Sequence, residues 1–371
     1  MGSLRTVNIV LAGGGTAGHT SPLIATAQQL HVLAPEAALL CVGTPKGLET
    51  RVIPEAGLEL ALIPPVPLPR RLTIELFAVP GRLFDAVRQA RGVLKRHTAD
   101  VVIGFGGYVS LPVYLAARQL KVPIVLHEQN AVPGLANRIA ARFATVVGVS
   151  FPETRLPHAE HLGLPMRQAI ADLDRPAARA AARTRFGFSD DLPVLLVSGG
   201  SQGARSINHA LAAALPKLLA AGVNVLHVLG PANLTPEIVE QQESVTGARY
   251  LPLAYVDAMD QAYAAAELMV GRSGAGTVME TAMVGLPTIF VPLPHGNGEQ
   301  ARNADFLLAA DAAVLVADAE LSGPRLASEV LALISDQPRL AAMGQRCRAL
   351  VPSGAARALA ELALGAARKE R

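Results

Sequence analysis

The strongest constraint on the fold is a pattern that occurs twice, once near the start of each half of the chain. In both places an apolar run with strand character enters a glycine-rich turn and then a segment with helical character. The first turn reads GGGTAGH at residues 13–19, and the second reads GGSQGAR at residues 199–205. Glycine lets a backbone approach a ligand closely, and the helix that follows directs free N–H groups toward an anion. The pattern predicts two α/β domains with a phosphate-bearing ligand between them.

The composition fits this prediction and excludes other classes of protein. A chain of 371 residues that is 51% hydrophobic and 17% charged can form two separate cores. Its net charge of +3, its 4% aromatic content and its lack of tryptophan argue against a nucleic-acid partner. Cys41 and Cys347 lack the spacing of a metal or redox pair and indicate reduced thiols in a cytosolic protein. Without a signal-peptide pattern or a membrane-spanning apolar run, we expect a soluble or peripherally attached protein.

Short β-branched runs follow one another along both halves of the chain. They lie at 7–11, 38–42, 101–103, 124–127 and 146–149, and again at 194–197, 225–229, 249–252, 268–270, 288–291 and 313–316. Strands that are apolar on both faces are typical of parallel sheets covered by helices. The expected fold is therefore α/β, with two Rossmann-like, doubly wound parallel sheets that face one another across a cleft (the GT-B arrangement).

The domain boundaries follow from a break in the strand pattern. Between residues 150 and 191 several prolines and an Ala/Arg-rich helix at 176–186 take the place of strands. We expect an amino-terminal domain at 1–162, a connection at 163–191 and a second domain at 192–354. Residues 355–371 form an Ala/Leu-rich helix with a basic end, and we expect this helix to complete the first domain.

The first glycine-rich turn matches G-x-G-x-x-G between a strand and a helix, which alone would predict a dinucleotide site. That fingerprint also requires a carboxylate at the end of the next strand, and here the strand at 38–42 runs into Gly43 and Thr44. The lysine of an NTPase phosphate loop is absent as well. The sequence favours a backbone cradle for a different anionic group, and a purely structural tight turn is the alternative.

Polar groups follow three strands of the first half. His19 comes directly after the glycine-rich turn, at a helix start whose dipole favours the neutral imidazole, so it is a candidate general base. The segments GFGGY at 104–108 and HEQN at 127–130 leave the carboxyl ends of two other strands. Such ends meet at one edge of a parallel sheet, so we expect these groups to gather there. A packing role for His19 and a plain surface loop at 127–130 are the alternatives.

The second half has a comparable arrangement. The segment GRSGAGTVME at 271–280 opens a helix after a strand, with Glu280 inside that helix. A diphosphate would lie at the helix start, and the carboxylate can accept two sugar hydroxyls. Residues 292–303 then carry Glu299, Gln300 and Asn303, a spacing that suits a carbohydrate. Helix capping with ordinary loop polarity is the alternative.

No metal constellation is predicted, because the D-x-D sequence at 172–174 lies away from any expected strand end. Residues 70–97 interleave apolar with basic side chains, a pattern that suits an anionic membrane surface. A core helix with a solvated basic face is the alternative. The expected membrane contacts are Leu76, Phe77, Phe84, Arg70, Arg71 and Arg82.

Together these motifs resemble the MurG family of peptidoglycan glycosyltransferases, of the two-Rossmann-domain GT-B class. The resemblance covers nearly the whole chain and rests on the order and spacing of the motifs. Besides the two glycine-rich turns they are GFGGYVSLP at 104–112, HEQN at 127–130, GLPMR at 163–167, RSGAGTVMET and GLPTIFVPLP within 272–294, and EQARNA at 299–304.

The resemblance implies a reaction, its partners and a location. N-acetylglucosamine would pass, with inversion, from UDP-N-acetylglucosamine to the muramyl 4-hydroxyl of undecaprenyl-diphosphate-muramyl-pentapeptide (lipid I), giving lipid II. The family works without a bound metal or other cofactor. The protein would lie peripherally on the cytoplasmic face of the membrane, and the resemblance leaves its oligomeric state open.

The resemblance also implies roles for individual residues. Candidates for the catalytic base are His19 and Glu128, of which His19 is preferred. The backbone of Val256 would hold the uracil. The acceptor side would include Gly106, Gly107, Tyr108 and Asn137. The donor would contact Thr16, Ala17, Gly18, Asn130, Arg167, Ser201, Val256, Ala275, Gly276, Thr277, Glu280 and Gln300.

The sequence departs from the family pattern in three places. Residues 16–18 stand where the family often has Gly-Gly, Glu299 stands where His or Gln is common, and Leu164 stands where Asn is common. Glu299 cannot donate as an amide does, so its sugar contact is left open, and Leu164 receives no role. Three other functions also stay open: a UDP-N-acetylglucosamine 2-epimerase, another UDP-sugar glycosyltransferase, and a nucleotide-sugar-binding protein without catalysis.

Overall fold

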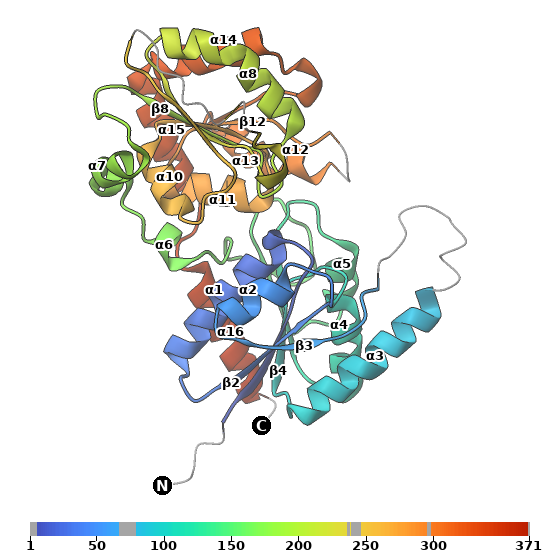
Figure 1. The fold of residues 1–371 in the computed structure, drawn as a ribbon. Coiled ribbons are helices and arrows are strands. Elements are labelled where there is room, and N and C mark those ends of the chain that lie inside the picture. The colour runs from blue at the N-terminus through green and yellow to red at the C-terminus, as the bar shows by residue number, and fades with distance from the viewer. Residues whose placement is uncertain (1–5, 67–78, 236–237, 239–245, 295–297, 370–371) are drawn as a thin grey trace. The chain divides into compact units, whose positions relative to one another are not determined.

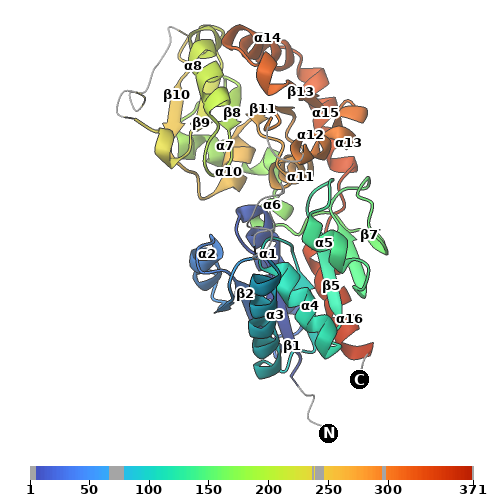
Figure 2. The ribbon, with the colours of Figure 1, turned by 90° about the vertical axis from the view of Figure 1, so that its right-hand side faces the viewer.

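The computed structural model describes residues 6–66, 79–235, 238, 246–294 and 298–369. They form two compact units: unit 1 comprises residues 1–167 and 354–371, and unit 2 comprises residues 168–353 (Figures 1 and 2). Each unit contains one parallel sheet covered by helices. The predicted fold class, with two doubly wound parallel sheets, is therefore confirmed.

Unit 1 has seven strands in the order β3-β2-β1-β4-β5-β6-β7. All of their pairings are parallel. The strands are β1 (Asn8–Ala12), β2 (Ala38–Gly43), β3 (Glu59–Leu62), β4 (Val101–Gly104), β5 (Ile124–Glu128), β6 (Val146–Val149) and β7 (Ala159–His161). The helices are α1 (Ala17–Leu33), α2 (Glu49–Glu55), α3 (Val79–Arg96), α4 (Ser110–Leu120), α5 (Leu135–Ala140) and α16 (Ala355–Lys369).

Both faces of the unit 1 sheet are buried. Ile9 and Leu11 of β1 belong to the same apolar cluster as Leu23 of α1 and Leu359 of α16. Val10, which points to the other face, packs in a second cluster that contains residues of α3 and α4. Successive side chains of a strand point to opposite faces, so two covered faces require continuous apolar strands. The carboxyl-terminal helix α16 is thus part of the unit 1 core.

Unit 2 has six parallel strands in the order β10-β9-β8-β11-β12-β13. The strands are β8 (Val194–Ser198), β9 (Asn224–Val228), β10 (Tyr250–Leu253), β11 (Leu268–Gly271), β12 (Thr288–Phe290) and β13 (Ala313–Leu315). The helices are α6 (Gln168–Ala171), α7 (Arg175–Phe186), α8 (Arg205–Ala220), α10 (Met259–Ala265), α11 (Ala275–Val284), α12 (Glu299–Asn303), α13 (Asp305–Ala309), α14 (Gly323–Ile334) and α15 (Gln337–Ala349), with short 3-10 turns at Pro231–Asn233 and Asp318–Glu320.

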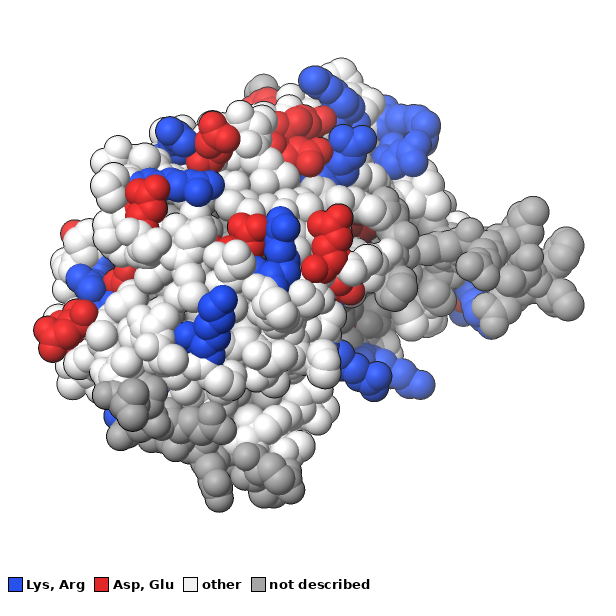
Figure 3. Space-filling view, turned by 90° about the horizontal axis from the view of Figure 1, so that it is seen from above, with Lys and Arg blue, Asp and Glu red and all other residues white. Residues whose placement is uncertain are grey.

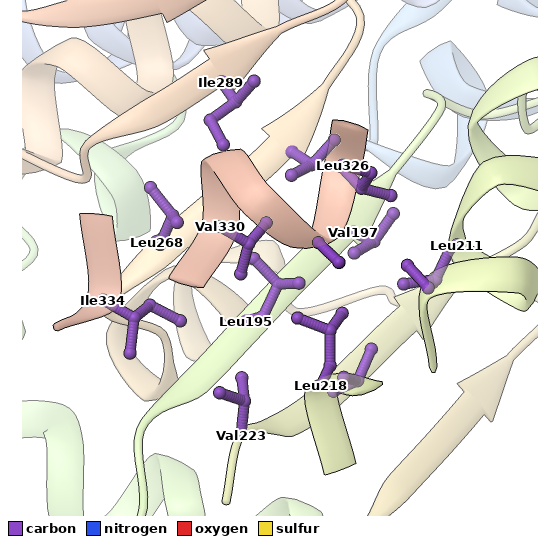
Figure 4. Packing of buried hydrophobic residues seen from close by; sticks show 14 of the residues in the cluster. Leu195, Val197, Leu211, Leu218, Val223, Leu268, Ile289, Leu326, Val330 and Ile334 are labelled. Carbon is purple, nitrogen blue, oxygen red and sulfur yellow. The ribbon is translucent and has the colours of Figure 1, made fainter. Parts of the chain in front are cut away.

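The largest apolar cluster of unit 2 lies between its sheet and the helices α8 and α14. Figure 4 shows Leu195 and Val197 of β8 beside Leu211 and Leu218 of α8 and Val330 of α14. Each such side chain contributes about 1.5–3 kcal/mol when it leaves water. This packing fixes the strands whose carboxyl ends carry the glycine-rich turn.

The connection suggested by the sequence, residues 163–191, is divided between the units: residues 163–167 belong to unit 1 and residues 168–191 to unit 2. Arg175 of α7 donates to the carbonyl oxygens of Tyr263, Ala266 and Gly285. The buried Arg183 guanidinium pairs with Glu267. Two arginines that satisfy interior carbonyls and a carboxylate hold α7 against the unit. At the start of α7, Asp174 caps the helix by accepting from the Ala177 N–H, so this acid of the D-x-D sequence is a cap.

Two strands differ from the sequence-based expectation. The edge strands β3 and β7 were not predicted, because β7 is exposed along its length and β3 is only partly covered. Exposed edge strands do not carry an apolar run. Helix α1 begins at Ala17, so His19 lies at a helix start as expected, and Pro22 lies inside the helix.

The described residues contain no helix that is long and apolar enough to span a membrane. On the face drawn in Figure 3, basic and acidic side chains are interspersed among uncharged ones. The modest net charge of +3 is consistent with that mixture.

Candidate functional site

The glycine-rich turns occupy equivalent places in the two sheets. In unit 1 the strand order reverses between β1 and β4, and in unit 2 it reverses between β8 and β11. Doubly wound sheets bind ligands at the carboxyl ends of the strands at such a reversal. Residues 13–18 and 104–108 lie there in unit 1, as do 199–203 and 271–276 in unit 2. Each unit thus has one candidate ligand-binding edge.

The two glycine loops of unit 1 are packed against each other. Gly107 has a φ of +84°, and a Cβ there would lie 2.6 Å from the Gly14 carbonyl oxygen. A Cβ on Gly106, also at φ +84°, would lie 3.4 Å from Cε1 of His19. Only glycine allows this approach together with a positive φ. The predicted acceptor-side glycines therefore lie beside the imidazole of His19.

A carboxylate that the sequence analysis missed supports the first glycine-rich turn. Glu49, in the first turn of α2, is fully buried. Its Oε2 accepts from the Gly15 N–H at 2.7 Å, and its Oε1 accepts from the N–H and hydroxyl of Thr44, both at 2.8 Å. A Cβ added at Gly14, Gly43 or Gly47 would collide with the side chain of Glu49. A carboxylate does lie beyond β2, but it binds the protein's own loop.

Burial and hydrogen bonding act in opposite directions on this acid. Burial raises the pKa of Glu49, whereas the hydrogen bonds from Gly15 and Thr44 lower it, and the pKa lies below its ordinary value. The acid is therefore ionised at neutral pH. The signal available in the sequence was an acid, Glu49, shortly after a predicted strand. The glycines at 14, 43 and 47 leave room for its side chain.

His19 lies at the end of a chain of side-chain hydrogen bonds. Its Nδ1 is 2.9 Å from Oε1 of Gln129, and Nε2 of Gln129 is 3.1 Å from Nδ1 of His127. Nε2 of His127 is 2.9 Å from the carbonyl oxygen of Gly163. His127 and Gln129 are buried, and burial lowers the pKa of His127 to about 4. His19 itself is half-buried, in the third position of α1.

Glu128, the second candidate base, lies in the interior. It is 1% exposed and accepts from the N–H groups of Asn130 and Gly134 and from Nδ2 of Asn137. Burial raises the pKa of Glu128 despite these hydrogen bonds. Asn137 is equally buried, and its Oδ1 accepts from the Tyr114 hydroxyl. Both side chains hold the loop after β5 in place, so neither is exposed to an acceptor in this structure.

The remaining predicted residues of unit 1 are more open. Thr16, Ala17 and Gly18 are exposed at the start of α1, Asn130 is half-buried, and Tyr108 is 55% exposed. Arg167 is exposed at the last position before unit 2. These groups are therefore accessible to a ligand of unit 1.

In unit 2 the start of α11 is formed by small residues. Gly274 is its N-cap residue without a side-chain cap, and Ala275, Gly276 and Thr277 form the first turn. Uncapped N–H groups at a helix N-terminus attract an anion. Glu280 lies in the next turn, where its Oε2 accepts from the Tyr263 hydroxyl at 2.7 Å. The uncapped helix start and the Glu280 carboxylate thus follow one another along α11 in the predicted order, and their roles toward a ligand stay a prediction.

A second group that the sequence analysis did not single out is Arg272. Its guanidinium donates to the carbonyl oxygens of Val291 and Pro292 and to Asp318. It also donates to the hydroxyl of Ser206 at 2.9 Å, and that hydroxyl donates to Asp318. This network joins the carboxyl ends of β11 and β12 to the start of α8. The signal in the sequence that could have identified Arg272 is its position within a glycine-rich segment.

The other residues predicted for the donor surround this edge of the unit 2 sheet. Gln300 Oε1 accepts from the Leu293 N–H at 3.0 Å, and Asn303 Nδ2 donates to the Ser273 carbonyl oxygen. Asn303 is fully buried and thus holds α12 against the turn before α11. Val256 is 8% exposed after β10, whereas Ser201 is exposed in the loop after β8.

The segment predicted to contact a membrane is only partly described. Leu76, Phe77, Arg70 and Arg71 lie outside the described residues. Helix α3 buries one face, which includes Val87 and Leu94, while Phe84 is 71% exposed. Arg82 is exposed as well, together with Arg88, Arg91, Lys95 and Arg96. Among the described residues no cluster of three or more His, Cys, Asp or Glu side chains could hold a metal ion.

Two doubly wound parallel sheets, each with a glycine-rich turn at its strand reversal, define the class of α/β proteins with two Rossmann-like domains, to which the GT-B fold belongs. Residues 9–149 match the N-terminal domain of glycosyltransferase family 28, and residues 194–358 match its C-terminal domain. The chain belongs to glycosyltransferase family 28, so it is a glycosyltransferase.

Individual relatives agree with this family. A Cutibacterium acnes protein named UDP-N-acetylglucosamine–N-acetylmuramyl-(pentapeptide) pyrophosphoryl-undecaprenol N-acetylglucosamine transferase is 58% identical over 367 residues, which cover 97% of this chain and 98% of that protein. The crystal structure of Acinetobacter baumannii MurG is 27% identical with a TM-score of 0.78, over 97% of this chain and 99% of that one.

A UDP-N-acetylglucosamine 2-epimerase is also similar in structure. Its TM-score is 0.65 at 12% identity, over 97% of this chain and 95% of the epimerase. At that identity the likeness shows a shared fold and leaves the activity aside.

Proposed function

We propose that this protein transfers N-acetylglucosamine from UDP-N-acetylglucosamine to N-acetylmuramyl-(pentapeptide) pyrophosphoryl-undecaprenol. The observation that carries the proposal is the 58% identity to the Cutibacterium acnes transferase along 97% of this chain. The matched region covers nearly the whole chain, so both candidate ligand edges fall within its length. The muramyl 4-hydroxyl is the proposed nucleophile and UDP the leaving group.

We propose His19 as the general base. The acceptor oxygen bonds to C1 of the sugar while the bond from C1 to UDP breaks with its electron pair, and the hydroxyl proton passes to His19. The imidazole is half-buried and lies beside the Gly106 and Gly107 loop. Glu128 is buried and its oxygens accept three hydrogen bonds, so we assign it a structural role. Thr16, Ala17, Gly18, Asn130 and Tyr108 are the proposed unit 1 contacts of the two substrates.

The start of α11 is proposed to receive the diphosphate of the donor. Its uncapped N–H groups and the positive end of the helix dipole stabilise the charge that develops on the leaving UDP. Glu280 would accept ribose hydroxyls, and the backbone at Val256 would hold the uracil. Ser201, Arg167 and Gln300 are proposed to complete the donor site.

The reaction is tested by measuring UDP release with and without the lipid-linked muramyl-pentapeptide acceptor. We expect release and a disaccharide product only with acceptor, and at an unchanged rate in EDTA. Consumption of UDP-N-acetylglucosamine without acceptor, with N-acetylmannosamine as product, would identify an epimerase and refute the transfer. Substrate binding without any turnover would indicate a binding protein.

We also propose that unit 1 attaches to the cytoplasmic face of the membrane through α3. Its exposed Phe84 lies among exposed arginines, and each well-placed cation contributes about 1 kcal/mol at an anionic surface. Phe84→Asp should weaken binding to vesicles that contain anionic lipid without changing UDP affinity. The matched control is Val32→Asp, which alters a residue of α1 that is 69% exposed. Equal vesicle binding by both variants would contradict the proposal.

A further inference from the structure

The side-chain amide of Gln129 has a defined orientation. Its Nε2 lies 2.9 Å from the carbonyl oxygen of His127. A carbonyl oxygen can only accept, so the amide presents its NH₂ group to that oxygen. The reverse orientation would place two oxygens against each other. The Oε1 atom of Gln129 therefore faces His19.

This orientation determines which nitrogen of His19 carries the proton. Gln129 Oε1 is 2.9 Å from Nδ1 of His19 and can only accept, so Nδ1 must donate. A neutral imidazole has one N–H group, and Nε2 is then unprotonated. Within the described part of the chain, His19 Nε2 makes no hydrogen bond. The nitrogen with the free lone pair is the one a general base requires.

The far end of the chain has the same polarity. His127 Nε2 donates to the Gly163 carbonyl oxygen at 2.9 Å, which leaves Nδ1 of His127 to accept from the Gln129 NH₂ group at 3.1 Å. Both contacts require a neutral His127 with its proton on Nε2. The Gly163 carbonyl oxygen at one end thus orients three side chains in turn, those of His127, Gln129 and His19.

We propose that Gln129 is a positioning residue that fixes the tautomer of His19, with His127 and the Gly163 carbonyl fixing Gln129 in turn. The proposal rests on the proposed role of His19 as base. When the acceptor hydroxyl gives its proton to Nε2, the Nδ1–H group continues to donate to Gln129 Oε1, so the chain needs no rearrangement. In free histidine the proton prefers Nε2, and without Gln129 the reactive nitrogen would be occupied. In serine hydrolases, loss of the correct tautomer alone lowers kcat by about 10⁴.

The test combines NMR with kinetics on the full-length protein. In ¹⁵N-histidine-labelled protein, His19 is assigned by comparison with the His19→Asn variant. We expect a protonated Nδ1 and an unprotonated, pyridine-type Nε2 at neutral pH. Gln129→Met keeps the length of the side chain but removes the acceptor. It should shift the His19 proton to Nε2 and lower kcat by about 10- to 100-fold, with KM for UDP-N-acetylglucosamine unchanged.

Two further variants separate this role from a general loss of structure. Gln129→Glu keeps an acceptor toward His19 but places its second oxygen against the His127 carbonyl oxygen, so it should keep the His19 proton on Nδ1, lower the stability of unit 1 and give a kcat between those of Gln129→Met and the wild-type protein. Gln28→Met, an exposed position on the same helix as His19, is the control and should change neither readout. Hydrogen exchange of β5 tests whether unit 1 stays folded in each variant.

The outcomes also separate this proposal from the proposed function. A proton on Nε2 of His19 in the wild-type protein refutes the positioning role, whatever the activity. An unchanged tautomer and kcat in Gln129→Met refute it as well. If the wild-type protein shows the expected tautomer but no transfer to the lipid acceptor, the proposed function fails while the orientation by Gln129 stands.

Discussion

Glu49 offers a direct test of how the first glycine-rich turn is held. Its carboxylate accepts from Gly15 on one oxygen and from the two Thr44 donors on the other. Glu49→Gln keeps the shape of the side chain but removes the charge and one acceptor. Whichever way the new amide turns, its NH₂ group faces a backbone N–H group, of either Gly15 or Thr44.

The expected cost follows from these contacts. Hydrogen bonds to a charged acceptor stabilise by about 1.5–3 kcal/mol each, against about 0.5–1.5 kcal/mol for neutral ones. If the amide keeps its oxygen toward Thr44, the Gly15 N–H loses its acceptor, at about 1–3 kcal/mol. We expect the loop to lose about 3 kcal/mol of stability, or roughly a 100-fold higher opening constant, since 1.4 kcal/mol is a factor of ten.

The assay is hydrogen exchange of peptides that cover residues 13–18, together with kcat for transfer. Exchange at Gly15 should accelerate roughly 100-fold, in proportion to the opening constant of the loop, and kcat should fall as the loop beside His19 loosens. The control is Glu55→Gln on the same helix, because Glu55 is exposed and pairs only at 4.0 Å with Arg51. Unchanged Gly15 exchange in Glu49→Gln, or an equal change in Glu55→Gln, would refute this account of the loop.

The pH dependence of the same contact has a definite sign. The folded-state pKa of Glu49 lies below its ordinary value, so ionised Glu49 stabilises the fold above the unfolded pKa of about 4.3. That contribution is lost as the pH falls through the lower folded-state pKa. Protection of Gly15 should decrease in acid in the wild-type protein and not in Glu49→Gln.

Three further predictions concern single sites. Gly107→Ala should lower kcat and destabilise unit 1 by about 2–4 kcal/mol, since its Cβ would press on a carbonyl oxygen. The control Gly57→Ala, at φ +75° with open space, should cost only about 1 kcal/mol. Equal shifts in the melting temperature of the two variants would contradict this prediction. Burial lowers the pKa of His127 to about 4, so its neutral form stabilises the fold above the unfolded value near 6.5, and about 3 kcal/mol is lost between pH 6.5 and 4. In His127→Gln the free energy of unfolding, measured with urea, should depend less on pH over that interval. A pH dependence equal to that of the wild-type protein would contradict this prediction. Arg183→Met breaks a buried ion pair and should destabilise unit 2 by about 3–5 kcal/mol, as measured by urea unfolding. The control Arg325→Met breaks an exposed pair and should cost under about 1 kcal/mol. Similar values for the two variants would refute the role of the buried pair.

The sequence was sufficient for the fold class because local and global signals agree along most of the chain. Both faces of each sheet are covered, so the strands had to be apolar throughout, and continuous runs such as residues 101–103 are easy to identify. The edge strands β3 and β7 were not predicted because one side of each has no neighbouring strand and little cover. Their pairing depends on the neighbouring strand of the sheet, so their own residues show no apolar strand pattern.

The two acids near the first site show where the sequence was insufficient. Glu128 follows a buried strand and was a reasonable candidate base, yet its oxygens are engaged by the loop after β5. Glu49 had no apparent role, yet it holds the turn in front of His19. Both roles depend on which backbone N–H groups the folded chain brings within hydrogen-bond distance.

The sequence by itself determined the two doubly wound units, the glycine-rich turns at their strand ends and the residue types that gather there. Periodicity and turn chemistry are local properties, so they can be recognised before the chain folds. Only the tertiary structure decided that Glu49 supports the first glycine-rich turn, that Arg175 and Arg183 hold α7 on unit 2, and that Gln129 turns its oxygen toward His19. Burial, hydrogen-bond partners and the proton position on an imidazole depend on residues far apart in the chain, whose proximity is a property of the fold.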